Sequence, residues 1–461
     1  MNAMAVPTDV KILNHFEVAP PPASVSSTTL PLSFLDIPWL NCLPMERLFF
    51  YQHPHPTHHF IQTILPTLTH SLSLALRHFF PFASLFISTP CPHKPHILYV
   101  DAQSSVPLTL AESSADFNYL IADYPRHVTD LHPLIPTLPP ARVLDDGSQA
   151  YPLMAIQFTV FPGSGFSIGV IFRHVAADGK SFHHFMKSWA SICRNRGTEE
   201  MQEIDAEPIH DRVSVQDPDE LEEFFLNWWW NVGKNRMMEV KSDIFINKVR
   251  ATIVLRRAQI EKLKNWVSEL ANTTKVSSFV ATCSLIWVCL LKSEEKEGDG
   301  EEDDDKPCCF VFSADCRNRY GLSIPETYFG NCLAFCYVGV KRKVVVGEFG
   351  LGEAAKAIGN KVKEMEREGL GGAKKWVEYW KEMGSGLHKV IVGASPRFKV
   401  YETDFGWGKV KKSEVVHTDK LGIISLAESR DEEGGIEIGL SLPKDQMERF
   451  NVILNKCLGS M

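Results

Sequence analysis

The sequence predicts an α/β protein that is divided into two domains. Segments with the apolar pattern of buried strands alternate with segments of helical spacing in both halves of the chain. At 461 residues the chain is longer than one hydrophobic core usually supports. Residues 197–223 turn polar and acidic, so we interpret them as a linker between an N-terminal domain, residues 1–196, and a C-terminal domain, residues 224–461.

The N-terminal domain contains short runs rich in Val, Ile and Phe, which predict strands, and runs with apolar residues at helical spacing, which predict helices. Residues 28–40 are punctuated by prolines and are expected to be extended, where Asp36 could line a cleft and contact substrate. The predicted strands are 10–18, 96–100, 106–108, 153–161 and 166–172, and the predicted helices are 60–80 and 180–194.

The C-terminal domain shows the same alternation. Residues 224–230 (FFLNWWW) are aromatic enough to be expected in the core. Residues 292–306 are mostly acidic and have no apolar side chain, so burial cannot order them and a solvated, disordered loop is expected. The predicted strands are 248–255, 310–313, 389–392, 398–401, 422–425 and 436–442, and the predicted helices are 258–270, 277–291, 354–368 and a final C-terminal segment.

Composition excludes several classes of function. A net charge of −8 and a pI near 6.1 leave no basic stripe to neutralise the phosphates of a nucleic acid. The first residues lack the features of a signal peptide, and no apolar run of about 18 residues predicts a membrane span. Eleven scattered cysteines are typical of reduced thiols, so we expect a cytoplasmic monomer. The histidines of the run YQHPHPTHHF are separated by prolines and have no nearby carboxylate, so no metal is expected.

One stretch, residues 163–182, combines a buried strand, a turn and a helix around a single histidine. His174 follows the predicted strand 166–172, and Asp178 stands just before the helix 180–194. A histidine at the end of a buried strand is held by rigid neighbours, and its imidazole can accept and return a proton near neutral pH. A lone His-x-x-x-Asp also occurs in proteins where the histidine is only structural. The motif alone therefore leaves catalysis and structure as alternatives.

Four further motifs accompany this stretch. They are TTLPLSFLD (28–36), SADCRNR (313–319), YFGNC (328–332) and DFGWG (404–408). Together with HVAAD (174–178), these motifs resemble the BAHD family of plant acyl-CoA-dependent acyltransferases, in the family's order and over nearly the whole chain. The resemblance implies a two-domain fold like that of chloramphenicol acetyltransferase, with mixed sheets and flanking helices. It also implies a segment of the second half that extends the first sheet, which the sequence does not locate.

The resemblance implies a mechanism centred on His174. Its imidazole would deprotonate an acceptor hydroxyl, which attacks the thioester directly, and would then protonate the departing CoA thiolate. Asp178 would turn away from the reaction and pair with Arg317, which orients the loop that carries His174; Arg319 is the neighbouring candidate. Cys316 would be a bystander, because no acyl-enzyme is expected.

DFGWG would serve the fold rather than the chemistry. Gly406 and Gly408 permit backbone geometries that other residues resist, and Asp404 and Trp407 would pin the loop. The segment continues as GKVKK, with Val410 where many relatives of the family have proline.

The resemblance indicates the class of each substrate but not its identity. Lys275, Ser277 and Ser278 match a stretch that contacts acyl-CoA in relatives, although a serine there could equally cap a helix. The YFGNC motif resembles the subgroup that acts on flavonoid and other phenolic glycosides, commonly at the 6-hydroxyl of a glucose. Lys180 and Ser395 favour malonyl-CoA over a hydroxycinnamoyl-CoA as the donor, although Lys180 could also be a solvated residue of the first helical turn.

Two other classes of function stay open from the sequence. A non-catalytic binding protein could keep the fold without turnover. The intact set of His174, Asp178 and DFGWG counts against it, because a descendant that keeps only the fold has no reason to retain His174. A hydrolase of phenolic esters is the other alternative. The order Gly163-Ser164-Gly165 is not a nucleophile elbow, which counts against a serine hydrolase.

Overall fold

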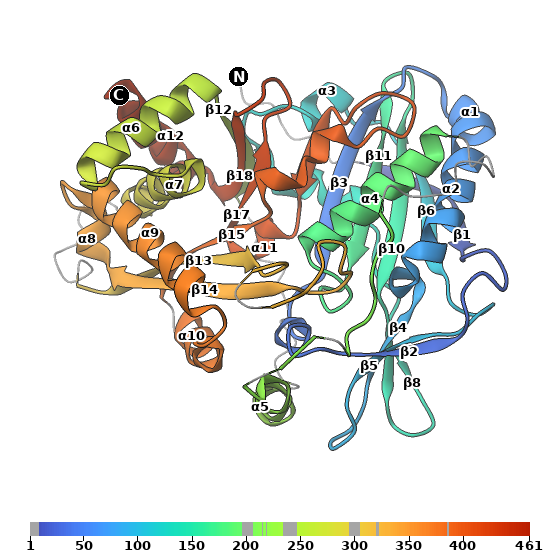
Figure 1. Cartoon of the computed structure of the whole chain (residues 1–461). Helices are drawn as coiled ribbons and strands as arrows, with labels where there is room; N and C mark the ends of the chain where they lie inside the picture. Colours follow the sequence, from blue (N-terminus) through green and yellow to red (C-terminus); the bar gives the residue numbers. More distant parts are fainter. Residues whose placement is uncertain are drawn as a thin grey trace.

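The computed structural model describes residues 9–195, 206–213, 215–217, 219–233, 247–294, 305–319, 322–384 and 387–461. These residues form an α/β structure with three sheets and flanking helices (Figure 1). The predicted fold class is therefore confirmed. No helix in the described ranges combines the length and apolar character that crossing a bilayer requires.

The first sheet has six strands in the order β1-β6-β10-β11-β3-β16. Its central strands β10 and β11 are buried at every position, as their unbroken apolar runs require. Helix α4 (Gly179–Arg194) crosses one face of the sheet beside α2 (Leu65–His78) (Figure 1). The strands are β1 (Val10–Val18), β6 (Val106–Ser113), β10 (Met154–Phe161), β11 (Gly165–Phe172), β3 (Met45–Gln52) and β16 (Lys412–Val415).

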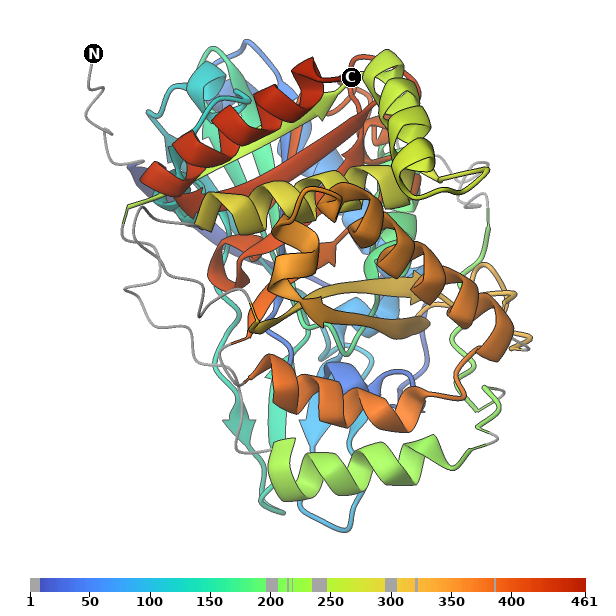
Figure 2. The same cartoon turned by 90° about the vertical axis from the view of Figure 1, so that its left-hand side faces the viewer.

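The second sheet has seven strands in the order β14-β13-β15-β17-β18-β12-β7. Helices α6 (Arg257–Leu270), α7 (Ser278–Glu294), α9 (Gly350–Glu368) and α12 (Lys444–Gly459) pack together outside it (Figure 2). Helix α7 lies in the middle of this layer and is apolar on all sides. The strands are β14 (Leu333–Lys341), β13 (Pro307–Asp315), β15 (His388–Gly393), β17 (Ile423–Glu428), β18 (Ile436–Pro443), β12 (Lys248–Leu255) and β7 (Arg126–His127).

A third, smaller sheet has the order β2-β5-β4-β9-β8. Its strands are β2 (Thr28–Pro31), β5 (His96–Tyr99), β4 (Leu85–Ser88), β9 (Gln149–Pro152) and β8 (Arg142–Val143). The remaining short α-helices are α1 (Thr57–His59), α3 (Phe117–Leu120), α5 (Leu221–Trp228), α8 (Arg342–Val346), α10 (Trp376–Met383) and α11 (Thr418–Leu421). Short 3-10 or π turns occupy Ile37–Trp39, Phe60–Ile64, Phe80–Ala83, Val128–Asp130, His132–Leu134, Trp229–Gly233, Ala373–Lys375, Pro396–Phe398 and Val400–Glu402.

The two large sheets exchange strands. Strand β16 comes from the second half of the chain but pairs with β3 in the first sheet, as the resemblance implies. Strand β7 comes from the first half but pairs with β12 in the second sheet. Helix α5 begins inside the predicted linker and packs through Phe225 against Trp376, with ring centroids 5.7 Å apart. The boundaries at residues 196 and 224 stay a prediction.

Some predicted elements are corrected. The strand expected at 398–401 is wrong, because two 3-10 turns meet there at Lys399, whose φ of 51° breaks an extended chain. The segment 28–40 is extended only as far as Pro31 and then turns into Ile37–Trp39. Strands β3 and β14 were not predicted. Of the predicted acidic loop, residues 292–294 end α7, and residues 295–304 lie outside the described ranges.

Candidate active site

His174 lies directly beyond the C-terminal end of β11, which ends at Phe172. The residue is 9 % exposed, so it is held within the protein while part of it remains accessible. Its imidazole stacks on the indole of Trp39, with the ring centroids 4.2 Å apart and the planes 10° from parallel. A stacked aromatic neighbour fixes the plane of the imidazole and can stabilise its cationic form.

A hydrogen bond to Asn331 determines which nitrogen of His174 carries the proton. His174 Nδ1 lies 2.9 Å from Asn331 Oδ1. The Nδ2 group of Asn331 donates to the carbonyl oxygen of His174 at 2.8 Å and to Asp36 Oδ1 at 3.0 Å. Because Oδ1 can only accept, Nδ1 of His174 must donate, which leaves Nε2 with a free lone pair. This is the tautomer that a general base requires at Nε2.

Asp36 supports this arrangement from within the protein. Its carboxylate is fully buried and accepts hydrogen bonds from Ser33, from Arg212 Nε at 3.1 Å, and from both the backbone and the side-chain nitrogen of Asn331 at 3.0 Å. The sequence predicts a substrate contact for Asp36. The structure instead places every one of these contacts inside the protein, one step behind His174.

Asp178 turns away from His174. It is the N-cap of α4 and accepts from the backbone nitrogen of Ser181 at 2.9 Å. Its Oδ2 also accepts from Arg317 Nη1 at 2.8 Å and from the backbone nitrogen of Cys332 at 3.0 Å. The Asp178–Arg317 ion pair that the resemblance implies is thus present, and both side chains are completely buried. Arg319, the neighbouring candidate, is exposed.

Arg317 and Asp178 join three distant segments of the chain. Arg317 donates to the carbonyl oxygens of Tyr328 and Gly330 as well as to Ser181 Oγ. The loop that carries Asn331 and the loop that carries His174 are therefore held to each other by a shared set of buried hydrogen bonds.

Burial lowers the pKa of His174 below its ordinary value of 6.5, and the nearby guanidinium of Arg47 also lowers it. The hydrogen bond with Asn331 and the negative charge of Asp178 act in the opposite direction. A lowered pKa keeps the imidazole neutral at neutral pH, which is the protonation state that can accept a proton.

The DFGWG segment forms a tight loop. Asp404 Oδ1 accepts from the backbone nitrogens of Gly406 at 2.8 Å and Gly408 at 3.1 Å. Both glycines have φ near 100°, which other residues rarely adopt. Phe405 packs edge-on against Trp189 of α4 at 4.8 Å, and Trp407 packs against Phe166 of β11 at 6.4 Å. The loop thus contacts the two elements that flank His174 without making a contact to its ring.

The family model described as "Transferase family" matches residues 10–454. The chain belongs to this family, the BAHD acyltransferases. It is 39 % identical to "Coumaroyl-CoA:anthocyanidin 3-O-glucoside-6''-O-coumaroyltransferase 1" of Arabidopsis thaliana, over 97 % of each chain. It is 36 % identical to "Malonyl-coenzyme A:anthocyanin 3-O-glucoside-6''-O-malonyltransferase" of Dahlia pinnata, over 98 % of each chain. The crystal structure of vinorine synthase shares the fold, with a TM-score of 0.68 at 18 % identity and coverage of 97 % and 98 %.

The residues predicted to bind the donor in this BAHD acyltransferase have mixed surroundings. Lys180 Nζ donates to Asp315 at 3.0 Å and also to Glu326, so two carboxylates already hold its charge. Ser395 Oγ accepts from the backbone nitrogen of Arg397 at 3.2 Å and caps a 3-10 turn. Lys180 is thus paired within the protein and Ser395 serves as a helix cap, so neither contact is evidence of donor binding.

The residues predicted to bind CoA lie at the start of α7. Ser277 Oγ accepts from the backbone nitrogen of Val280 at 3.2 Å, which is a helix-capping bond, and Ser278 is the first residue of the helix. Lys275 and Ser277 are exposed. Capping and contact with an anion are compatible here, because an N-terminus of a helix attracts negative charge.

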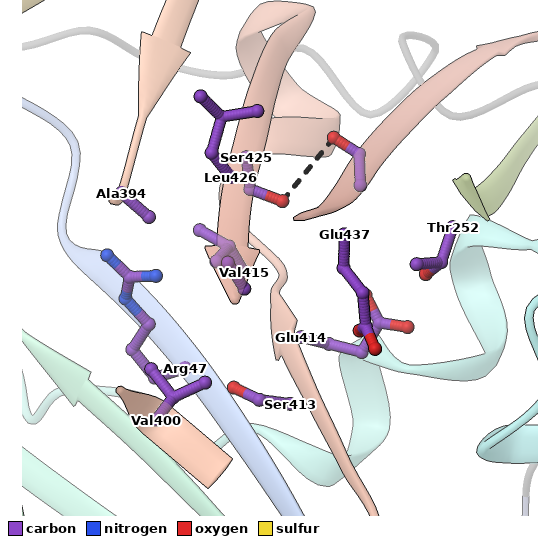
Figure 3. Close-up of a pocket in the computed structure, with 12 residues that line it drawn as sticks. Arg47, Thr252, Ala394, Val400, Ser413, Glu414, Val415, Ser425, Leu426 and Glu437 are labelled. Atoms are coloured by element: carbon purple, nitrogen blue, oxygen red, sulfur yellow. Dashed lines mark hydrogen bonds between the residues drawn. The ribbon is translucent and has the colours of Figure 1, made fainter. Parts of the chain in front are cut away.

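A cavity lies where the crossover strand β16 meets the second sheet (Figure 3). The space between its atoms is about 370 Å³, open solvent included. Its walls come from both sheets: Arg47, Thr252, Ala394, Val400, Ser413, Glu414, Val415, Ser425, Leu426, Ala427, Glu437 and Gly439.

Sequence reasoning missed two kinds of site residue in this BAHD chain. Asn331 is the fourth residue of YFGNC, a motif that supports the family resemblance and an acceptor class but that was assigned no role beside His174. Asn331 could have been suspected, because a buried amide can orient an imidazole. Arg212 lies in the predicted linker and Arg47 near the start of an unpredicted strand, so no local sequence pattern indicates either residue.

Proposed function

We propose that this BAHD acyltransferase transfers the acyl group of malonyl-CoA to a sugar hydroxyl, most simply the glucose 6-hydroxyl, of a flavonoid or other phenolic glucoside. The observation that carries the proposal is His174, a partly accessible histidine whose free nitrogen is Nε2. Relatives named as acting on anthocyanin and phenolic glucosides support the acceptor class.

Proton transfer at His174 Nε2 accounts for both halves of the reaction. Nε2 takes the proton of the acceptor hydroxyl as its oxygen attacks the thioester carbonyl carbon. The tetrahedral intermediate collapses by breaking the carbon–sulfur bond, and the imidazolium returns the proton to the CoA thiolate. Asn331 Oδ1 accepts from Nδ1 throughout, and the face of Trp39 stabilises the transient positive charge. The products are the glucoside ester and free CoA thiol.

Asp178 and Arg317 act in this proposal as positioning residues. Their ion pair fixes the first turn of α4 to the loop that carries Asn331. DFGWG likewise braces β11 and α4. The exposed side chains of Lys275 and Ser277 and the start of α7 at Ser278 stay our candidates for contact with CoA.

A hydroxycinnamoyl donor is the second candidate. Relatives named as coumaroyltransferases support it, at 39 % and 38 % identity. It is also favoured by the ion pairs of Lys180, which remove one of the two features that point to malonyl from the sequence.

We further propose a cytosolic monomer. All eleven cysteines lie in described residues and are free thiols, most of them buried. Reduced thiols are typical of proteins in a reducing compartment.

A thiol-release assay tests the proposed function. Malonyl-CoA and p-coumaroyl-CoA would each be supplied with a panel of flavonoid and simple phenolic glucosides, and the products weighed by mass spectrometry. We expect thiol release that depends on the glucoside, with a product heavier by one malonyl group. Acid release without any glucoside would indicate a hydrolase, and no release with any donor would indicate a binding protein.

A further inference from the structure

Arg47 is a buried cation without a counter-charge. It lies on β3 between Val170 of β11 and Val415 of β16, and the residue is only 5 % exposed. Among the described residues, none forms a hydrogen bond or ion pair with its guanidinium, and its Nε is completely enclosed. Burial lowers the pKa of Arg47 to about 10, with no carboxylate opposing the change.

The other buried arginines of the described chain have partners. A buried guanidinium normally needs a carboxylate, since an uncompensated buried charge is strongly destabilising. Four of them pair with buried carboxylates, and Arg342 donates to a carbonyl oxygen. The pairs are Arg126–Glu414, Arg212–Asp36, Arg250–Glu414 with Arg250–Asp419, Arg317–Asp178, and Arg342 with the Leu291 carbonyl.

The carboxylates that line the same cavity are not available to Arg47. Glu414 is held by Arg126 and Arg250, at 2.6 and 3.1 Å. Glu437 accepts from the hydroxyl of Tyr401 at 2.6 Å. Figure 3 shows the guanidinium of Arg47 on the side of Ala394, away from both glutamates. The cavity therefore presents an unneutralised cation on one wall.

This cation acts electrostatically on His174, the proposed catalytic base. Strand β3 pairs with β11 along its whole length, and His174 follows the end of β11. The positive charge of Arg47 contributes to the lowered pKa of His174. An anionic group bound at Arg47 would therefore act electrostatically on His174.

We propose that Arg47 binds the free carboxylate of a dicarboxylic acyl donor and so selects malonyl-CoA over donors whose acyl group is uncharged. This inference rests on the proposed acyl transfer and names the group that recognises the donor. A guanidinium binds a carboxylate through two parallel hydrogen bonds, which orients as well as attracts it. An acetyl or coumaroyl group leaves Arg47 unpaired, so the charge discriminates against it.

Donor competition in matched variants tests the inference. The kcat/KM values for malonyl-CoA and acetyl-CoA, which lacks only the distal carboxylate, would be measured with one glucoside acceptor. We expect Arg47→Gln to lower kcat/KM for malonyl-CoA about 100-fold and to change the acetyl-CoA value less than about 3-fold. Arg47→Lys keeps the charge but loses the planar fork, so an intermediate loss is expected.

Lys180→Gln is the matched control, because it removes a lysine whose charge is already held by Asp315 and Glu326. We expect it to leave the ratio of the two donors unchanged. Thermal unfolding of each variant checks folding. If Arg47→Gln does not fold, protection of the wild-type protein against heat by free malonate, compared with propionate, replaces it, and equal protection by both overturns the inference.

The outcomes separate the inference from the function on which it rests. An equal loss for both donors in Arg47→Gln would mean that Arg47 holds CoA or the fold rather than the acyl carboxylate. A wild-type enzyme that prefers coumaroyl-CoA and is insensitive to Arg47→Gln also overturns the inference. In both cases the acyltransferase stands, whereas no transfer from any donor contradicts the proposed function itself.

Discussion

Arg317 and Arg47 are both buried, yet their surroundings are opposite. Arg317 meets the carboxylates of Asp178 and Asp315, two carbonyl oxygens and a hydroxyl, so its bonding capacity is used within the protein. Arg47 meets no carboxylate and faces a cavity. A buried charge whose hydrogen bonds are made within the protein holds segments of the chain in place, whereas a buried charge without a partner can bind an anionic ligand. The comparison separates the residues that build this site from those that would recognise a substrate.

Replacing His174 is expected to give the largest effect, because in the proposed mechanism this residue is the base that the surrounding network positions. His174→Ala should lower kcat by about 10²- to 10⁴-fold while leaving the protein folded. Thiol release measures the rate, and circular dichroism measures the fold. His15→Ala, which removes an exposed histidine of β1, is the control. Near-wild-type turnover in His174→Ala would rule out the mechanism.

Removing Asp178 would take from Arg317 its completely buried counter-charge and leave only Asp315, whose side chain is 33 % exposed. Asp178→Ala should lower the free energy of unfolding by about 3 kcal/mol, because the buried cation of Arg317 then keeps only the partly exposed Asp315 as a carboxylate partner. Activity should fall with it, since the loops that carry His174 and Asn331 lose one of the hydrogen bonds that connect them. Urea unfolding measures the stability. Arg47→Gln removes a charge that is already unpaired, so it should not lower the free energy of unfolding. If both variants are equally stable, the two arginines do not differ in the way proposed.

The role of Asn331 in orienting His174 can be tested with a substitution that removes no charged group. Asn331→Leu removes the acceptor of the Nδ1 proton and should lower kcat about 10- to 100-fold with little change in KM. The hydrogen bond with Asn331 also raises the pKa of His174, so the variant should lose activity at a lower pH than the wild type. Steady-state kinetics over a pH series gives both results. A loss of stability with an unchanged pH profile would show that Asn331 contributes to packing and does not affect the pKa of His174.

The pH dependence provides the smallest and most specific test. The base must be neutral, and its pKa in the folded protein lies below 6.5. Activity should therefore be full above this pKa and be lost as the pH falls through it, so the acid limb of kcat/KM should lie below pH 6.5. In Arg47→Gln a repelling cation is gone, and the limb should move to higher pH. If the acid limb of kcat/KM does not shift in Arg47→Gln, the charge of Arg47 does not affect the pKa of His174.

The sequence predicts the motif-borne part of this site well. His174 and Asp178 stand between a strand and a helix whose apolar patterns are unambiguous, and the structure places them there. The Asp178–Arg317 pair could be anticipated from the family resemblance. These features depend on local sequence pattern or on motifs that occur together in one family, so they can be predicted from a single sequence.

The rest of the site depends on long-range pairing, which local pattern does not encode. Asp36 and Asn331 are 295 positions apart, and their hydrogen bond follows from the fold alone. Arg47 is the third residue of β3, and nothing in MERLFFYQ indicates that the strand is enclosed by β11 on one side and β16 on the other. The strand predicted at 398–401 is wrong because a local apolar pattern does not distinguish a strand from consecutive turns. The apolar residues there lie in turns on either side of Lys399, whose backbone is left-handed.

The strand exchange sets the order in which this chain can finish folding during its synthesis. β3 carries a run of buried apolar side chains, and its outer edge stays unpaired until residues 412–415 leave the ribosome. An unpaired apolar edge is a template for pairing with other chains. A nascent or truncated chain that stops before β16 therefore displays this edge to its neighbours, and completion of the C-terminal half both closes the active-site region and removes the hazard.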